Sequence, residues 1–235
     1  MLKLSRLPTG EPEIFESIQG EGATAGVPSV FVRLSLCNLS CSWCDTKYTW
    51  DWGQYDPEAE IIPVSVPKAT ARVLESQLGN VVITGGEPLL QQRELVPLVR
   101  ALKTAGRRIE IETNGTVVPV PDLTDLVDQW NVSPKLGNSR NSSAKREVRA
   151  ALEWFARSDG AYFKFVVVQP DDVREVQRLR ARYKVPNERV ILMPEGTRPE
   201  ALAERSSWLA ERCRELGYRY SNRLHVLLWG DERGR

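Results

Sequence analysis

The sequence predicts an α/β fold built on a parallel sheet or barrel. Short runs rich in β-branched residues alternate with longer segments of helical periodicity, which is typical of parallel strands joined by helical crossovers. Strands are expected at Val30–Leu36, Val81–Thr84, Arg108–Glu112, Gln129–Ser133, Tyr162–Val168, Arg189–Leu192 and Arg223–Leu228. Helices are expected at Val66–Leu78, Gln91–Thr104, Ser143–Ala156, Asp171–Tyr183 and Arg198–Leu216. No repeat, low-complexity segment or linker divides the 235 residues, so we expect one domain over residues 1–235.

Unusual polar residues follow five of these strands. The five segments are Cys37, Thr84–Pro88, Glu112–Gly115, Ser133–Lys135 and Met193–Gly196. Because the carboxyl ends of parallel strands meet at one edge of a sheet or barrel, the five segments are expected to surround a common site.

Composition excludes several classes of function. The hydrophobic fraction of 41% and the charged fraction of 27% are ordinary for a globular protein, and the net charge of +1 predicts neither a nucleic-acid partner nor a membrane surface. The N-terminus lacks the apolar stretch of a signal peptide, and apolar runs such as Phe165–Val168 and Val226–Trp229 are too short to cross a bilayer. A cytoplasmic location is therefore expected.

Three of the four cysteines lie within eight residues in the pattern C-x3-C-x2-C, at Cys37, Cys41 and Cys44. Clustered thiolates suit zinc or an iron–sulfur cluster, and structural zinc normally takes four protein ligands. Only Cys213 and His225 remain, far along the chain, and Cys213 shares an apolar helix face with Leu202, Leu209 and Leu216 that predicts a core position. The pattern therefore favours a [4Fe–4S] cluster with one open iron, while a zinc with three thiolates and a water remains an alternative.

The cysteine pattern after the first predicted strand resembles the signature of the radical S-adenosylmethionine superfamily, and Thr84–Pro88 resembles its GGEP element. The resemblance implies a partial parallel β/α barrel. It also implies that the methionine portion of S-adenosylmethionine binds the open iron, with Glu87 accepting from its amino group, and that reductive cleavage gives a 5′-deoxyadenosyl radical. The residues expected to bind S-adenosylmethionine are Trp43, Asp45, Gly86, Glu87, Ser133, Pro134, Lys135, Met193, Pro194 and Glu195.

Further segments resemble one branch of this superfamily, the 7-carboxy-7-deazaguanine synthases. Residues 15–22 are similar to the S-x-Q-G-E-G motif of that family, residues 31–33 match the arginine before its first cysteine, and residues 44–46 match its C-D-T. The resemblance implies a ring contraction of 6-carboxy-5,6,7,8-tetrahydropterin with loss of ammonia, and a Mg²⁺ ion on the Thr46 hydroxyl. The residues expected to bind substrate are Ile18, Gln19, Gly20, Glu21, Arg33, Thr84 and His225.

The family resemblance also implies an electron donor, a flavodoxin or ferredoxin, and a homodimer. The segment Lys47–Pro63 is expected to be a loop that covers the cluster or contacts the reductase. Two rival functions share part of the pattern. A glycyl-radical activase also carries C-x3-C-x2-C and GGEP, although such enzymes often have an added ferredoxin-like cysteine region that this chain lacks. A non-catalytic zinc-binding module is the rival from a different class.

Overall fold

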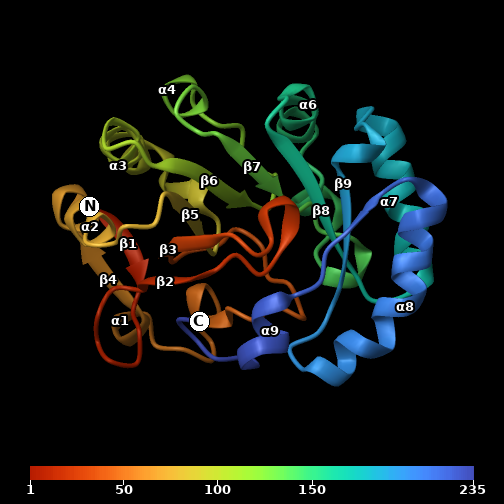
Figure 1. Cartoon of the computed structure of the whole chain (residues 1–235), viewed down its shortest axis with the longest axis horizontal. Coiled ribbons are helices and arrows are strands. Elements are labelled where there is room, and N and C mark those ends of the chain that lie inside the picture. Colours follow the sequence, from red (N-terminus) through yellow and green to blue (C-terminus); the bar gives the residue numbers. More distant parts are fainter.

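Ten strands form one curved sheet in the computed structural model, which describes all residues from 1 to 235 (Figure 1). The strands are β1 (Leu2–Ser5), β2 (Ile14–Ile18), β3 (Pro28–Leu34), β4 (Ile61–Val64), β5 (Asn80–Gly85), β6 (Arg108–Thr113), β7 (Gln129–Val132), β8 (Ala161–Val167), β9 (Val190–Pro194) and β10 (Arg219–Tyr220). Their order is β10-β9-β8-β7-β6-β5-β3-β1-β4, and β2 pairs with β3 outside this path. The run from β3 to β10 is parallel, whereas β1, β2 and β4 pair antiparallel.

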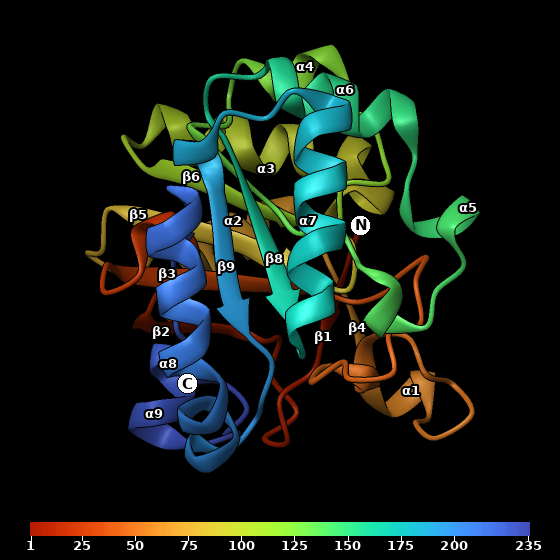
Figure 2. The ribbon, with the colours of Figure 1, turned by 90° about the vertical axis from the view of Figure 1, so that its right-hand side faces the viewer.

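Helices cover the outer face of the arc, as Figures 1 and 2 show for α3, α6, α7 and α8. The α-helices are α1 (Pro57–Glu60), α2 (Val66–Leu74), α3 (Gln92–Thr104), α4 (Pro121–Thr124), α5 (Ser143–Arg146), α6 (Arg149–Arg157), α7 (Pro170–Tyr183), α8 (Pro199–Leu216) and α9 (Leu224–Trp229). Short 3₁₀ turns are η1 (Gly22–Thr24), η2 (Lys47–Thr49), η3 (Pro88–Gln91), η4 (Gly137–Ser139) and η5 (Asn187–Arg189). The apolar faces of the larger helices pack on the sheet in a core of 38 buried residues that includes Cys213, as its helix face predicted. None of the helices is long and apolar enough to span a bilayer.

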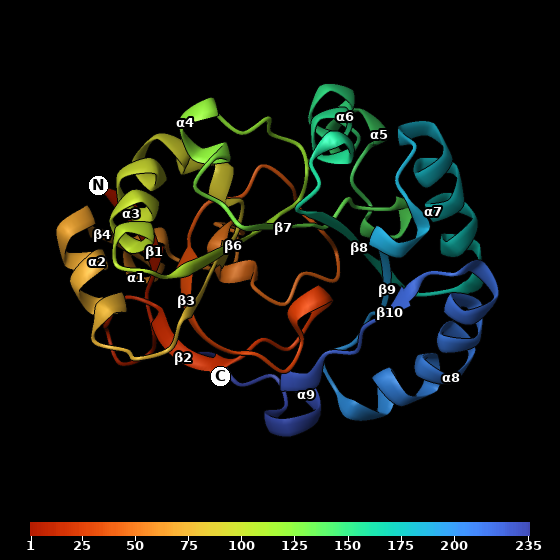
Figure 3. The same cartoon turned by 45° about the horizontal axis from the view of Figure 1, so that its top comes forward.

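The arc does not close into a complete barrel, which confirms the predicted partial parallel β/α barrel. Figure 3 shows the open side between β2 and β9, with α9 lying beside it. Backbone hydrogen bonds bridge this gap: the Ser221 amide donates to Leu192 of β9 at 3.0 Å, and the Leu224 amide donates to Gly20, beyond β2, at 2.8 Å. The segment that joins β10 to α9 therefore holds the two edges of the arc together.

Part of the inner face of the sheet is polar, around Glu110. Glu110 of β6 is fully buried and accepts from the Thr24 hydroxyl at 2.7 Å and from the Asn131 amide at 3.0 Å, and it also pairs with Arg108. A buried carboxylate is costly unless it is paired and hydrogen-bonded, and these partners meet that need. The hydrogen bond from Thr24 also anchors η1 against the inner face of the sheet.

Three expectations about secondary structure were wrong. Residues 223–228 were expected to form a strand, but they belong to the last turns of the chain and form α9, in which only Val226 is buried. The single helix expected over 143–156 is divided into α5 and α6. The segment 47–63, expected to be a loop, contains η2, α1 and most of β4. Short apolar runs are ambiguous between helix and strand, which explains the first error.

Candidate functional site

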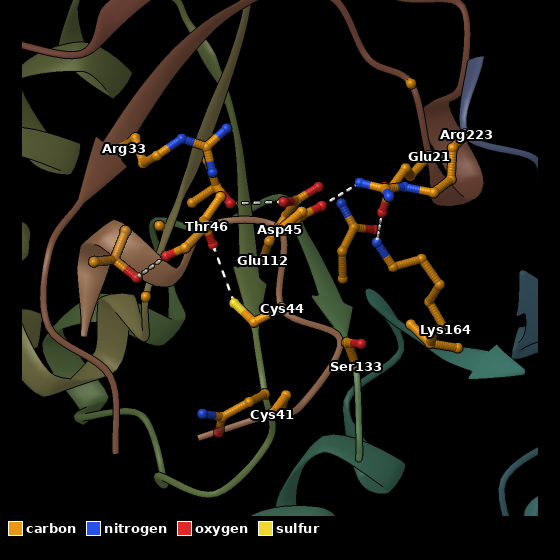
Figure 4. Close-up of a pocket in the computed structure, with 18 of the residues that line it drawn as sticks. Glu21, Arg33, Cys41, Cys44, Asp45, Thr46, Glu112, Ser133, Lys164 and Arg223 are labelled. Atoms are coloured by element: carbon orange, nitrogen blue, oxygen red, sulfur yellow. Dashed lines mark hydrogen bonds and ion pairs between the residues drawn. The ribbon is translucent and has the colours of Figure 1, made fainter. Parts of the chain in front are cut away.

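One pocket at the carboxyl ends of the parallel strands brings the predicted residues together (Figure 4). The register of the sheet explains this, since Arg33 lies opposite Thr84 in β5 and Glu112 lies opposite Asn131 in β7. Residues opposite each other point to the same face, so each strand presents one polar side chain to the interior. The predicted residues that line the pocket are Ile18, Gln19, Gly20, Glu21, Arg33, Cys37, Cys41, Trp43, Cys44, Asp45, Thr46, Thr84, Gly86, Ser133, Lys135, Met193, Glu195 and His225.

The structure does not bring Glu87, Pro134 and Pro194 to the pocket wall. Glu87 is fully buried, and its carboxylate accepts from the Thr113 hydroxyl at 2.8 Å and from the backbone amides of Asn114 and Leu89 at 2.7 and 3.0 Å. Burial raises the pKa of Glu87, and these hydrogen bonds oppose the rise. Glu87 therefore ties the end of β6 to η3 in this geometry, and a contact with a methionyl amino group stays a prediction.

Each of the three clustered cysteines lies within reach of an N–H donor. The Trp50 indole donates to the sulfur of Cys44 at 3.3 Å, the Asn141 amide donates to the sulfur of Cys41 at 3.3 Å, and the Leu39 amide lies 3.5 Å from the sulfur of Cys37. Such hydrogen bonds stabilise thiolate charge and tune the reduction potential of an iron–sulfur cluster. The sequence pattern gave no sign of Trp50 or Asn141 in this role.

The backbone around the first cysteine is unusual. Leu36 has a φ of 78°, in the left-handed region that a branched residue rarely adopts, and its amide and carbonyl are held by Thr49 at 2.8 Å and Glu87 at 2.7 Å. A Cβ atom on Gly85 would meet the Leu34 carbonyl at 2.0 Å, and one on Gly86 would meet the Leu36 carbonyl at 2.1 Å. The two glycines therefore permit the close approach of β5 to the backbone that carries Cys37.

The three thiols fit an iron–sulfur cluster better than a single metal ion. No group of three His, Cys, Asp or Glu side chains is placed to hold one ion, and tetrahedral zinc at a Zn–S distance of about 2.3 Å needs converging sulfurs. A cubane instead spreads its thiolates over separate irons. Burial raises the pKa of the Cys37 thiol to about 12 and raises that of Cys41, the opposite of what an activated cysteine nucleophile needs.

The wall near Cys41 carries a cation. The Lys135 ammonium donates to the Ser133 hydroxyl at 2.8 Å and lies 5.5 Å from the centre of the Trp43 ring, whose indole N–H donates to Asn138 at 3.2 Å. Ser133, Lys135 and Trp43 were all expected to bind S-adenosylmethionine. The structure places these three residues side by side. An ammonium group beside an aromatic ring is suited to a ligand that has both a carboxylate and a flat ring.

Arg33 presents free donors to the opposite end of the pocket. Its Nε donates to Glu13 at 2.7 Å, whereas neither terminal nitrogen has a hydrogen-bond partner in the protein. Burial opposes the charge of Arg33, but the Tyr48 hydroxyl and the carboxylates of Glu13 and Asp45 outweigh it and raise the pKa of the guanidinium. A permanently charged guanidinium with two terminal nitrogens free to donate is suited to binding a carboxylate.

The pocket that Arg33 lines also holds a charged cluster, made of Glu21, Asp45, Lys164 and Arg223 (Figure 4). Lys164 and Arg223 both pair with Glu21, the second at 2.9 Å, and Arg223 also pairs with Asp45 and donates to the Gly196 carbonyl at 2.7 Å. Both Glu21 oxygens are thus engaged by the protein. The expected contact of Glu21 with substrate stays a prediction.

The charges in this cluster control one another. Burial alone would raise the pKa of Glu21, but the charges of Lys164, Arg223 and His225 outweigh it and hold the pKa of that carboxyl well below its usual range. Burial, with the charge of Arg223 added, lowers the pKa of His225 even though Glu21 opposes the change. The imidazole of His225 is therefore uncharged at neutral pH.

Polar groups on the neighbouring strands are arranged around Glu112. Its two oxygens accept from the Gln19 amide at 3.1 Å and from the Thr84 hydroxyl at 2.7 Å. The backbone N–H and C=O of Gln19 are bonded to Val27 and Gly26, both at 2.8 Å. Gln19 was expected to bind substrate, but its backbone groups and its side-chain amide all have partners inside the protein, so this contact stays a prediction.

Three functional candidates were missed from the sequence: Glu112 as a side chain, Lys164 and Arg223. Lys164 interrupts an apolar strand with a charge, and such a residue must be paired inside the fold. That interruption is the signal that can identify Lys164, whereas Glu112 stands in a strand where charged and apolar residues alternate and gave no such signal. Arg223 carried no such signal, because its segment was read as a strand.

Comparison with known proteins agrees with this geometry. A model of the Radical SAM superfamily matches residues 32–140. The 7-carboxy-7-deazaguanine synthase of Pyrobaculum aerophilum is 42% identical, with 95% of this chain and 96% of that protein covered, and the enzyme of that name from Halobacterium salinarum is 38% identical over 93% and 90%. The crystal structure of QueE from Escherichia coli has a TM-score of 0.71 at 28% identity and covers 95% of this chain and 94% of its own. This chain therefore belongs to the 7-carboxy-7-deazaguanine synthase family within the radical S-adenosylmethionine superfamily.

Proposed function

We propose that this protein converts 6-carboxy-5,6,7,8-tetrahydropterin to 7-carboxy-7-deazaguanine with release of ammonia, which makes it a carbon–nitrogen lyase. Product and ammonia together contain all the atoms of the substrate, so no net oxidant is needed. The observation that carries the proposal is a single pocket lined both by the three clustered cysteines and by Arg33, whose two terminal nitrogens have no partner in the protein.

Cys37, Cys41 and Cys44 are suited to hold a [4Fe–4S] cluster, with N–H donors placed against their sulfurs. Together with bound S-adenosylmethionine, that cluster supplies the one-electron cleavage that starts hydrogen abstraction from the substrate. The side chains of this chain then hold the two organic molecules in register. We assign Ser133, Lys135 and Trp43 to the cofactor, while Glu87 ties the loop between β5 and η3 to the end of β6.

At the substrate end, Arg33 binds the carboxylate through its two terminal nitrogens. Glu112 accepts from N–H groups of the pterin ring. The Glu112 carboxylate is itself oriented by the Gln19 amide and the Thr84 hydroxyl, which donate to it at 3.1 and 2.7 Å. Because both Glu21 oxygens are paired with cations, the main role of Glu21 is to hold Lys164 and Arg223 in place in the pocket wall.

Thr46 is our candidate for the Mg²⁺ ligand. Its hydroxyl oxygen lies 3.5 Å from the Cys44 sulfur, and Thr46 lines the same pocket as Arg33 and the cysteines. A single hard oxygen from the protein fits this ion, since Mg²⁺ usually keeps several waters and takes further ligands from the substrate.

Several wider properties complete the proposal. We expect the chain to work as one domain in the cytoplasm, as a homodimer, with a flavodoxin or ferredoxin as electron donor. The single curved sheet and its one large core support the first of these expectations.

The test is product formation under anaerobic conditions with reductant, Mg²⁺, S-adenosylmethionine and carboxytetrahydropterin, followed by mass spectrometry. We expect 7-carboxy-7-deazaguanine from the wild type and from Cys213→Ala, which alters only a core thiol. Arg33→Ala should raise the KM for the pterin while S-adenosylmethionine is still cleaved. Cleavage of the cofactor with no deazaguanine product would point to another substrate and refute the proposal.

A further inference from the structure

Arg33 is held by the protein on one side only. Its Nε donates to Glu13 at 2.7 Å, and its backbone amide donates to the Glu13 carbonyl at 3.0 Å. Because the five donors of a guanidinium lie in one rigid plane, the partner of Nε decides where the two terminal nitrogens point. Glu13 therefore sets the orientation of the Arg33 guanidinium, the group that we assign to binding the substrate carboxylate.

Glu13 is completely buried and collects donors from three distant segments. One oxygen accepts from Arg33 and from the Tyr48 hydroxyl at 3.1 Å, and the other accepts from the Nε of Arg233 at 3.0 Å. Carboxylates and guanidinium groups usually pair through two parallel bonds. Since Arg233 occupies the second oxygen, Glu13 does not form a two-point pair with Arg33, and both terminal nitrogens of Arg33 stay available.

Arg233 is itself fixed from every side. Its guanidinium carbon lies 3.5 Å from the centre of the Tyr48 ring, its Nη1 donates to Glu60 at 2.9 Å, and its Nη2 donates to the Arg6 carbonyl. The side chain is only 19% exposed although Arg233 is the third-last residue of the sequence. Arg235, the other cation after α9, has a side chain that is 58% exposed, so among the residues after α9 this anchoring is specific to Arg233.

We propose that Glu13 and Arg233 are positioning residues that set the preference of the site for a carboxylated pterin. Arg233 holds one oxygen of Glu13, so that Glu13 binds Arg33 at a single point and leaves a two-pronged receptor for the substrate carboxylate. This inference rests on the proposed function, because it deepens the assignment of Arg33. Removing Arg233 frees the second Glu13 oxygen to rotate onto a terminal nitrogen of Arg33 and compete with the ligand.

Binding of two stable probes tests the proposal independently of turnover. The probes are 6-carboxypterin and pterin, which differ only in the carboxylate, and their dissociation constants are measured by calorimetry on the cluster-loaded protein. We expect the wild type to prefer the carboxylated probe and Arg33→Ala to lose that preference. Arg233→Ala should reduce the preference about three- to tenfold, the cost of leaving one long side chain to be ordered by the ligand, with the affinity for pterin unchanged.

Three further variants sharpen the test. Arg233→Lys keeps the charge next to Glu13 but not the fork over three partners, so it should restore part of the preference. Glu13→Gln should resemble Arg233→Ala, and if it fails to fold, the two substitutions at Arg233 still decide the matter. Arg212→Ala, on the exposed face of α8, is the matched control and should bind both probes as the wild type does.

Equal loss of affinity for both probes in Arg233→Ala would show a merely structural role and overturn the proposal, and so would an unchanged preference. Equal binding of both probes by the wild type would overturn it as well, because Arg33 would then not read the carboxylate. If the wild type discriminates between the probes but forms no deazaguanine, the proposed function fails, and the variants still decide whether Glu13 and Arg233 set the preference.

Discussion

Replacement of Arg223 by alanine removes the cation that joins three parts of the pocket wall. The guanidinium is 9% exposed and contacts Glu21 at 2.9 Å, the Gly196 carbonyl at 2.7 Å and the carboxylate of Asp45. After the change, Glu21 keeps only Lys164, and Asp45 keeps no charged partner. We therefore expect a large loss of stability from a residue near the end of the chain.

The size of the loss follows from the burial of each partner. Breaking a buried ion pair costs about 3–5 kcal/mol, because the remaining charge is left without compensation. Glu21 is 14% exposed but retains one cation, which places the cost near the lower end of that range, at about 3 kcal/mol. The side chain of Asp45 is 32% exposed, so water screens its share, which is about 0–1 kcal/mol. For a chain of this size, a loss of about 3 kcal/mol lowers the Tm by about 6–12 °C.

Scanning calorimetry at neutral pH measures this shift. Arg212→Ala is again the control, since an exposed arginine on α8 should change stability by no more than about 0.5 kcal/mol. The double variant Arg223→Ala, Glu21→Gln should be more stable than the sum of the two single losses, by about 0.5–3 kcal/mol, because the uncompensated carboxylate is gone. A Tm within about 2 °C of the wild type, or strict additivity in the double variant, would refute this account of the cluster.

Three other predictions follow from the site and its surroundings. Cys41→Ala should lose the iron and the visible absorption of the cluster after anaerobic reconstitution, whereas Cys213→Ala should retain both; iron analysis that finds no difference would contradict the assignment. Gly86→Ala should be severely destabilised, because its Cβ would meet the Leu36 carbonyl at 2.1 Å, while Gly79→Ala has open space around it and should be nearly neutral in urea unfolding. Because the folded pKa of Glu21 is depressed, its stabilisation is complete above pH about 4.5 and is lost as the pH falls below that value. Measured from pH 7 to 3.5, the stability advantage of the wild type over Glu21→Gln should shrink, and an advantage that stays constant would contradict the pKa shift.

The parallel part of the fold was predictable because each strand carries its own signal. The run Ala161–Val167, for example, is apolar or aromatic at every position except Lys164, and it is separated from the next strand by a helix of clear periodicity. The antiparallel strands β1, β2 and β4 were missed. β2 lies within the motif that was interpreted only as a substrate-binding segment, and β1 and β4 have four residues each, too few for an alternating pattern to be recognised.

The site was predictable as a list of residues more than as a set of contacts. Cys37, Cys41 and Cys44 are close in the sequence, and so their spacing alone indicates their common role. The pairing of Glu21 with Arg223 joins residues 202 positions apart, and no local pattern specifies which charges meet across such a distance. The burial of Glu87 was hidden for the same reason, since its partners come from the end of another strand.

The bridge from Ser221 to Leu224 across the open side of the arc has a consequence for how the protein folds. The hydrogen bond from the Leu224 amide to the Gly20 carbonyl joins residues more than 200 positions apart, whereas the neighbouring parallel strands β5 and β6 pair residues fewer than 30 positions apart. Because a contact that closes a long loop costs more chain entropy than one that closes a short loop, we expect this bridge to form after the strands have paired. The contacts that seal the pocket on this side are therefore among the last to form during folding.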